Sequence, residues 1–273
     1  MDYLRPDTLD DALAALAGGA RVLAGGTDLY PLAGPQLSGP VVDLAAVPGM
    51  AGLSLGPEGL RIGACTTWSA VAEAALPPAA RALQQAARVV GGRQIQNAGT
   101  VGGNLCNASP AADGVPPLMA LDTGVELVSA SGSRRLALAE FLLGPRRTAL
   151  RPGEVLAAVH LPAAALAGRS DFQKLGARAY LVISIAMVAV RLVVTEGRIT
   201  AAAVAVGACS PVARRLPAVE AALLGPLAGA TDRVDPATVA AGLDPIDDVR
   251  ATAAYRRGAA AELIRRAVTE ALE

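Results

Sequence analysis

Residues 97–113 read Asn-Ala-Gly-Thr-Val-Gly-Gly-Asn-Leu-Cys-Asn-Ala-Ser-Pro-Ala-Ala-Asp, and they form the most informative stretch of the chain. Three glycines, three asparagines, a threonine and a serine offer many small polar groups with little side-chain bulk, which suits an extended polar ligand lying along the backbone. A loop longer than ~12–15 residues without its own secondary structure is uncommon unless it is functional or disordered. We therefore expect a ligand-binding loop here, and a plain surface loop is the alternative.

A second glycine-rich stretch, Ala24-Gly25-Gly26-Thr27-Asp28-Leu29, follows the short apolar strand expected at residues 22–24. Glycines allow backbone N–H groups to approach an anion closely, and Thr27 adds a hydroxyl donor. The stretch is neither a Rossmann GxGxxG fingerprint nor a P-loop, because it has no third spaced glycine and no Gly-Lys-Ser/Thr. Taken alone, the stretch favours an ordinary tight turn, and an anion-binding concavity is the alternative.

The elements expected around these two stretches divide the chain into two parts. Up to about residue 165, strands alternate with helices, which favours an α/β unit. The elements are a helix capped by Asp7 or Thr8 and ended by Gly18-Gly19, strands at 22–24, 41–44, 60–64, 125–129 and 155–161, and a helix at 78–90.

Residues 163–170 are the best linker candidate, and an antiparallel sheet is expected after them. The expected elements are strands at 171–175, 182–194 and 199–208 with a hairpin turn at 195–198, and helices at 217–224, at 236–241 and from about 248. The fold class is therefore α+β, with a first domain over residues 1–165 and a second over 170–273.

Composition excludes several classes of protein. The 273 residues carry 24 basic and 24 acidic side chains, so nucleic acid is not expected as a partner. The longest apolar run, 179–190, is shorter than the ~20 residues that span a bilayer, and the N-terminus lacks a signal-peptide pattern, so we expect no membrane span and a cytoplasmic location. With Cys65, Cys106 and Cys209 far apart and one histidine, the chain itself is expected to ligate no iron–sulfur cluster or zinc ion.

The order and spacing of these motifs resemble the FAD-binding medium subunits of the molybdenum hydroxylases, the family of xanthine dehydrogenase and carbon monoxide dehydrogenase. AGGT at residues 24–27 and TVGGN at 100–104 correspond to the family's two signatures, and Asn107–Asp113 continues the second. The resemblance extends to Lys174-Leu175-Gly176-Ala177-Arg178, to Asp247–Arg250 and to Tyr255-Arg256-Arg257. It covers nearly the whole chain.

The resemblance implies a set of FAD-binding residues. The first loop would hold the pyrophosphate, and a side chain at Gly26 would occupy the space of that group. The second loop would follow the flavin and ribityl chain, Asp113 would supply the FAD-binding carboxylate with Ser109 nearby, and an apolar residue and a lysine would contact FAD further on. The implied residues are Val22, Leu23, Ala24, Gly25, Gly26, Thr27, Asp28, Leu29, Thr100, Gly102, Gly103, Asn104, Ser109, Asp113, Leu156 and Lys174.

Four single residues have alternative interpretations. Lys174 either stabilises a reduced flavin as a nearby cation or is a surface lysine at a strand end. His160 is read as part of a strand end rather than as a covalent flavin tether. Cys106 is read as a small buried apolar residue, with a redox or tethering role as the lesser alternative. Val90 stands where the xanthine dehydrogenase branch has an aromatic residue that could stack on the cofactor.

The function implied by the resemblance is electron transfer. The first domain would be a two-lobed FAD-binding domain of the vanillyl-alcohol-oxidase type, followed by a small domain with a three-stranded antiparallel sheet and helices. FAD would pass electrons from a small iron–sulfur subunit, fed by a large molybdenum-binding subunit, to NAD, a quinone or dioxygen, with no catalytic side chain and no metal on this chain. The alternatives are a self-sufficient flavin oxidase or dehydrogenase and a non-catalytic assembly subunit.

Overall fold

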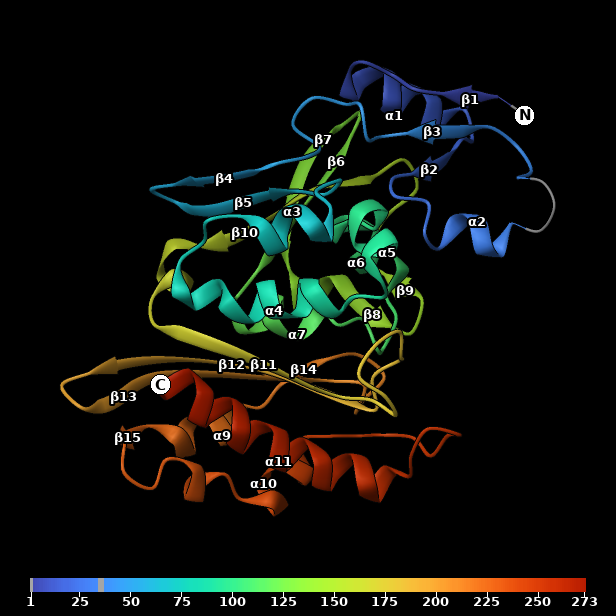
Figure 1. The fold of residues 1–273 in the computed structure, drawn as a ribbon. Helices are drawn as coiled ribbons and strands as arrows, with labels where there is room; N and C mark the ends of the chain where they lie inside the picture. Colours follow the sequence, from blue (N-terminus) through green and yellow to red (C-terminus); the bar gives the residue numbers. More distant parts are fainter. Residues whose placement is uncertain (1, 34–36) are drawn as a thin grey trace.

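The computed structural model describes residues 2–33 and 37–273, which form layers stacked from the N-terminus to the C-terminus (Figure 1). The first layer is a small parallel sheet in the order β1-β3-β2 with α1 packed on it. Thr8 caps α1 by accepting the N–H of Asp11, and the helix ends at Gly18, as the sequence predicted. This N-terminal lobe consists of β1 (Tyr3–Leu4), α1 (Leu9–Ala17), β2 (Arg21–Leu23), α2 (Leu29–Leu32) and β3 (Val41–Asp43).

The middle layer is a five-stranded antiparallel sheet in the order β4-β5-β10-β6-β7. Its strands are β4 (Leu53–Gly56), β5 (Gly59–Gly63), β6 (Gly124–Ser129), β7 (Gly132–Ala137) and β10 (Val155–Pro162). Short helices and a two-stranded hairpin accompany it. They are α3 (Trp68–Glu73), η1 (Pro78–Ala80), α4 (Arg81–Val89), α5 (Arg93–Ala98), α6 (Val101–Asn107), α7 (Val115–Ala120), α8 (Leu138–Phe141), β8 (Leu142–Gly144) and β9 (Arg147–Thr148).

The C-terminal sheet lies between α4 and α7 on one face and α9, α10 and α11 on the other (Figure 1). Its order is β11-β12-β13-β14, with β15 also paired to β13. The elements are η2 (Ala163–Leu166), β11 (Arg169–Leu175), β12 (Ala186–Thr195), β13 (Arg198–Gly207), β14 (Arg214–Arg215), α9 (Pro217–Leu223), β15 (Gly225–Pro226), η3 (Thr231–Arg233), α10 (Pro236–Ala241) and α11 (Ala253–Leu272). The hairpin turn predicted at 195–198 is confirmed, with Glu196 and Gly197 both at positive φ.

Four expectations from the sequence need correction. The C-terminal sheet has five strands rather than three, because β14 and β15, of two residues each, add to the three long ones. The linker candidate 163–170 instead contains η2 and the start of β11. The strand expected from residue 182 begins at Ala186, and the last helix begins at Ala253, where Thr252 caps it by accepting the N–H of Tyr255.

A further correction concerns residues 97–113, which are not one extended loop. They contain the end of α5 and all of α6, a two-turn helix with Thr100 as its cap. A helix of Val, Gly, Gly, Asn, Leu, Cys and Asn has poor intrinsic propensity, so it depends on packing of its buried residues Val101, Gly102 and Leu105. Gly102 brings α6 against the backbone at Ala64, and the helix lies beside the glycine loop.

Candidate functional site

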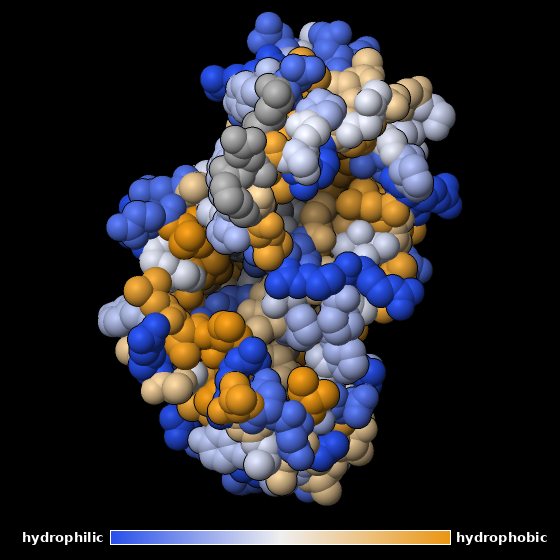
Figure 2. Space-filling model, turned by 90° about the vertical axis from the view of Figure 1, so that its right-hand side faces the viewer, coloured by the Kyte–Doolittle hydropathy of each residue, from blue (hydrophilic) through white to orange (hydrophobic). Residues whose placement is uncertain are grey.

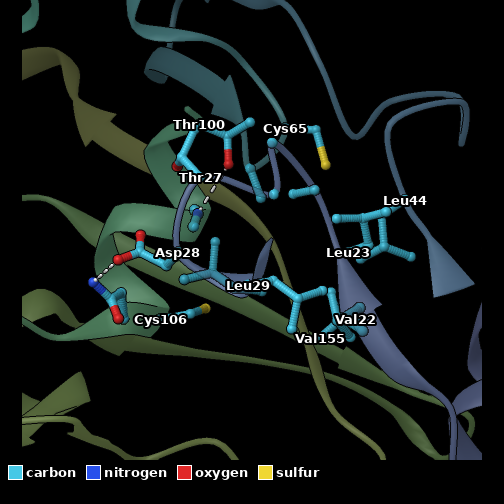
Figure 3. A pocket seen from close by; sticks show the side chains of 18 of the residues that line it. Val22, Leu23, Thr27, Asp28, Leu29, Leu44, Cys65, Thr100, Cys106 and Val155 are labelled. Carbon is cyan, nitrogen blue, oxygen red and sulfur yellow. Dashed lines mark hydrogen bonds between the residues drawn. The ribbon is translucent and has the colours of Figure 1, made fainter. Parts of the chain in front are cut away.

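A cavity of about 410 Å³ lies where the N-terminal lobe meets α6 and β10. This volume falls within the roughly 300–1,000 Å³ of small-molecule sites. Figure 2 shows the hollow on this face of the molecule, and Figure 3 shows apolar side chains and both glycine-rich stretches around it. We call it the glycine-loop cavity. Its lining residues are Val22, Leu23, Ala24, Gly25, Gly26, Thr27, Asp28, Leu29, Leu32, Leu44, Met50, Ala64, Cys65, Thr100, Gly102, Gly103, Cys106, Asn107, Leu150, Glu154, Val155 and Leu156.

The loop from Gly25 to Asp28 lines this cavity and carries unpaired backbone donors. Within the described part of the chain, the N–H groups of these four residues have no hydrogen-bond acceptor, whereas the N–H of Tyr30, two residues further on, donates to the carbonyl of Gly26. Consecutive free N–H groups form a concavity that suits an anion, because each contributes a partial positive charge. An ordinary tight turn would use such donors internally, so the geometry favours the anion-binding interpretation of this stretch.

The two glycines of the loop are required for different reasons. A Cβ on Gly25 would lie 1.9 Å from the carbonyl oxygen of Ala98, so only glycine allows the loop to lie this close to the end of α5. Gly26 has a φ of +71°, and its Cβ would lie 2.3 Å from the ring of Tyr30. A side chain at Gly26 would therefore collide first with the ring of Tyr30, and its effect on a bound pyrophosphate stays a prediction.

The opposite wall is the start of α6. Thr100 accepts the N–H of Gly103 at 3.0 Å, and the N–H of Gly102 donates to the carbonyl of Ala64 at 2.8 Å. These two N–H groups therefore already have acceptors within the protein. This wall can contact a ligand through van der Waals packing, but these N–H groups are not free to bind it. Asn104 does not line the cavity, and its side-chain oxygen is buried without a partner among the described residues.

The charged residues in the lining are Asp28 and Glu154, and each is linked to an arginine. The Glu154 carboxylate accepts two hydrogen bonds from Arg134, at 2.7 and 2.8 Å, and the N–H of Arg151. Hydrogen bonding to Arg134 is the main cause that lowers the pKa of Glu154 to about 2. Asp28 accepts the side-chain N–H of Asn107 at 2.8 Å, and the Asn107 oxygen in turn accepts from Arg146.

The lowered pKa of Glu154 predicts an acid-dependent loss of stability. Since the folded-state pKa lies below the ordinary value of 4.5, the stabilisation is complete above pH 4.5 and is lost as the pH falls toward 2. The size is about 2 to 3 kcal/mol. Urea unfolding between pH 6 and pH 3 should show a smaller pH dependence for Glu154→Gln than for the wild type. The exposed Glu58→Gln is the matched control, and equal pH dependence in all three proteins would contradict the prediction.

Asp113, Lys174 and Ser184 form a separate buried cluster. Lys174 Nζ lies 2.6 Å from one Asp113 oxygen, and the Ser184 hydroxyl donates to the other at 2.6 Å. Burial raises the pKa of the Asp113 carboxyl, and the Lys174 ammonium and Ser184 hydroxyl oppose that rise. The Lys174 side chain is only 13% exposed, so it is not a surface lysine, and its charge is already paired with Asp113.

Lys174 lines a second cavity, of about 420 Å³, and does not line the first. The residues around this second cavity are Gln85, Val89, Phe172, Lys174, Leu175, Gly176, Arg178 and Ala179. Of the sixteen residues implied by the resemblance, the structure thus brings twelve together in the glycine-loop cavity. The remaining four lie outside it, and they are Asn104, Ser109, Asp113 and Lys174.

The other singled-out residues have structural surroundings. His160 lies in β10, and its Nε2 is 2.6 Å from Glu126 on the neighbouring strand, as expected for a strand residue. Cys106 is exposed and lines the cavity, contrary to the expectation that it is buried, whereas Cys65 and Cys209 are buried. Sequence reasoning did not single out Glu154 or Arg146. The only signal for Glu154 is its place directly before the apolar strand at 155–161.

The geometry defines a protein with a glycine loop whose N–H groups are unpaired, a largely apolar cavity and a helix-covered C-terminal sheet. Residues 1–164 match the family described as the FAD binding domain in molybdopterin dehydrogenase, and residues 172–271 match the CO dehydrogenase flavoprotein C-terminal domain. The chain therefore belongs to the family of FAD-binding subunits of molybdopterin dehydrogenases, and the resemblance inferred from the motifs is confirmed.

Individual proteins agree with this assignment. The chain is 31% identical to the nicotine 6-hydroxylase medium subunit of Paenarthrobacter nicotinovorans, over 98% of this chain and 96% of that protein. It is 34% identical to the carbon monoxide dehydrogenase medium chain of Afipia carboxidovorans, over 59% of this chain and 58% of that one. It superposes on reconstituted CO dehydrogenase from Oligotropha carboxidovorans with a TM-score of 0.90 and 29% identity, over 99% and 97% of the two chains. Within the described ranges, no helix is long and apolar enough to cross a membrane.

Proposed function

We propose that this chain binds FAD in the glycine-loop cavity and serves as the electron-transfer subunit of a molybdenum- and iron–sulfur-containing dehydrogenase. The observation that carries the proposal is the row of unpaired N–H groups from Gly25 to Asp28, in residues that line a largely apolar cavity. The residues present fit a dinucleotide, because such a ligand combines a dianionic pyrophosphate with apolar rings. The family membership supports the same ligand.

The residue roles follow from where each lies. Gly25, Gly26, Thr27 and Asp28 would bind the pyrophosphate through their N–H groups, with the Thr27 hydroxyl as a further donor. Val22, Leu23, Ala24, Leu29 and Leu156 would cover the rings, and Thr100, Gly102 and Gly103 would form the opposite wall. Asn104, Ser109, Asp113 and Lys174 are retained as residues of the flavin end, which the first cavity does not include.

When bound, FAD would supply the redox centre for electron transfer from a small iron–sulfur subunit, fed by a large molybdenum-binding subunit, to NAD, a quinone or dioxygen. This chain's residues bind and orient that centre, and none is assigned as an acid or base. We also propose a cytoplasmic location, a division into domains at 1–165 and 170–273, and a vanillyl-alcohol-oxidase-type first domain. The two family matches support the division into domains, because one ends at residue 164 and the other begins at residue 172.

The first experiment is reconstitution of the purified chain with FAD, followed by removal of free cofactor and acid precipitation. We expect the visible flavin spectrum in an equimolar amount, and release of all colour into the supernatant. FMN, which lacks the adenosine half, should bind far more weakly because it leaves much of the cavity unfilled. Colour that remains in the precipitate would instead support a self-sufficient oxidase with a tethered flavin. A folded chain that retains no flavin would contradict the proposal and support an assembly subunit.

A further inference from the structure

We propose that Arg146 is a positioning residue for the cofactor, because it holds Asn107 against Asp28 and thereby fixes the glycine loop. This inference rests on the proposed function. Arg146 follows β8 in the hairpin turn and hydrogen-bonds to both the side-chain oxygen and the backbone carbonyl of Asn107, the latter at 3.3 Å. Asn107 is the last residue of α6, and its amide N–H donates to Asp28 at 2.8 Å. Three segments far apart in sequence are thus joined at the edge of the cavity.

The chain of contacts also orients the Asn107 amide. Its oxygen faces a cation and its nitrogen faces an anion, so only one orientation of the amide satisfies both neighbours. Figure 3 labels Asp28 of the glycine loop and draws its hydrogen bond as a dashed line; the partner is the side-chain amide of Asn107. Asp28 makes no side-chain cap with α2, so its carboxylate is free to serve this contact. Asn107 is consequently held by Arg146 on one side and holds Asp28 of the glycine loop on the other.

Charge explains why the loop needs this support. Asp28 belongs to the segment whose N–H groups face the anion site, so its carboxylate would repel a pyrophosphate placed there. Among the described residues the lining contains no lysine or arginine. The other lining carboxylate, Glu154, has Arg134 bonded behind it. Arg146 is connected to Asp28 through the neutral amide of Asn107, so each acidic side chain of the lining is linked to an arginine outside the lining, Glu154 directly and Asp28 through one residue.

The backbone of Arg146 is held in place as well. Its φ is +58°, and its N–H donates at 2.9 Å to the carbonyl of Ala108, which ends α6 with a φ of +46°. Non-glycine residues adopt this region when the surroundings impose it, often at binding sites. The side chain therefore starts from a fixed backbone beside the end of α6. Arg147, the next residue, is exposed and makes no side-chain hydrogen bond or ion pair within the described ranges.

The experiment measures the rate at which the reconstituted full chain releases FAD after dilution. The increase in fluorescence of the released flavin is the signal. Arg146→Ala should release FAD about tenfold faster, since a charge-assisted hydrogen-bond network is lost. Arg147→Ala removes the same charge one residue away and should stay within about twofold of the wild type. Alanine keeps the same backbone requirement as arginine, and the thermal midpoint of the cofactor-free Arg146→Ala chain should match that of the wild type.

A double-mutant cycle with Asn107→Ala gives a second readout. If Arg146 acts through Asn107, adding Arg146→Ala to Asn107→Ala should cause little further acceleration. Equal acceleration by Arg146→Ala and Arg147→Ala would show a general charge effect and would overturn the positioning role, as would additive effects in the cycle or an unchanged rate in Arg146→Ala. A wild-type chain that binds no FAD would instead overturn the proposed function itself, so the two failures are distinct.

Discussion

Replacing Gly25 by valine is expected to yield a chain that retains no FAD. The new Cβ would stand 1.9 Å from the carbonyl oxygen and 2.6 Å from the carbonyl carbon of Ala98. Both are backbone atoms at the end of α5, so they cannot rotate away as a side chain would. The loop must move, and the N–H groups of Gly25 to Asp28 then lose their common orientation. The measurement is the ratio of bound flavin to protein after reconstitution.

Two companion variants keep the Gly25 test informative. Gly25→Ala adds the Cβ alone and should also lose most of the flavin, even if the valine variant fails to fold. Gly56→Ala is the matched control, because nothing lies within 4 Å of its added Cβ and its φ is not positive. It should bind FAD normally. A folded Gly25→Ala chain with full flavin content would show that the loop conformation does not govern cofactor binding.

Replacing Lys174 by methionine is expected to lower the free energy of unfolding by about 3 kcal/mol, because breaking a buried ion pair leaves an uncompensated charge. The Asp113 carboxylate would keep only the hydroxyl of Ser184 as a partner. Burial already raises the pKa of Asp113, and loss of the ammonium raises it further. The ionised form is therefore disfavoured in the folded variant, whose stability should decrease as the pH rises through that pKa. Urea unfolding at pH 5 and pH 8 measures both effects.

The controls separate pairing from mere loss of charge. Arg178→Met removes a cation that lines the same second cavity but is exposed, and it should change stability by less than about 0.5 kcal/mol. The double variant Lys174→Met/Asp113→Asn removes both charges and should recover more than half of the loss. A single variant as stable as the wild type at both pH values would mean that the pair makes no net contribution.

The sequence predicted the local elements well where a short-range signal exists. Thr8 and Gly18 delimit α1, Glu196-Gly197 form the hairpin turn, and the glycine motif at 24–29 consists of residues that line the cavity. Family resemblance was needed to add Val22, Leu23, Thr100, Gly102, Gly103 and Leu156, which line the same cavity, because the segments that carry most of them meet only through the tertiary fold.

Other features had no signal in the sequence. Residues 101–107 combine helix-poor residues, and their helix depends on packing against Ala64, which no local pattern reveals. The two-residue strands β14 and β15 are defined by their pairing with β13. Lys174 and Asp113 are 61 positions apart, so their contact, like that of Arg146 with Asn107, depends on the three-dimensional arrangement. Long-range pairing of charged side chains is what single-sequence reasoning missed.

The buried helix α7 connects the first part of the chain to the C-terminal sheet, so it limits where the protein can be divided into fragments. All six of its residues are buried, and β12 and β13 of the other half pack on it. Arg191 of β12 and Arg215 of β14 donate hydrogen bonds to the carbonyls of Ala120 and Met119 at its end. An expression fragment that stops near residue 165 would expose this apolar helix and leave its carbonyls without their arginines. The contact between α7 and the C-terminal sheet is therefore part of the protein core. A chimera made from two relatives would have to take α7 and the strands that pack on it from the same parent.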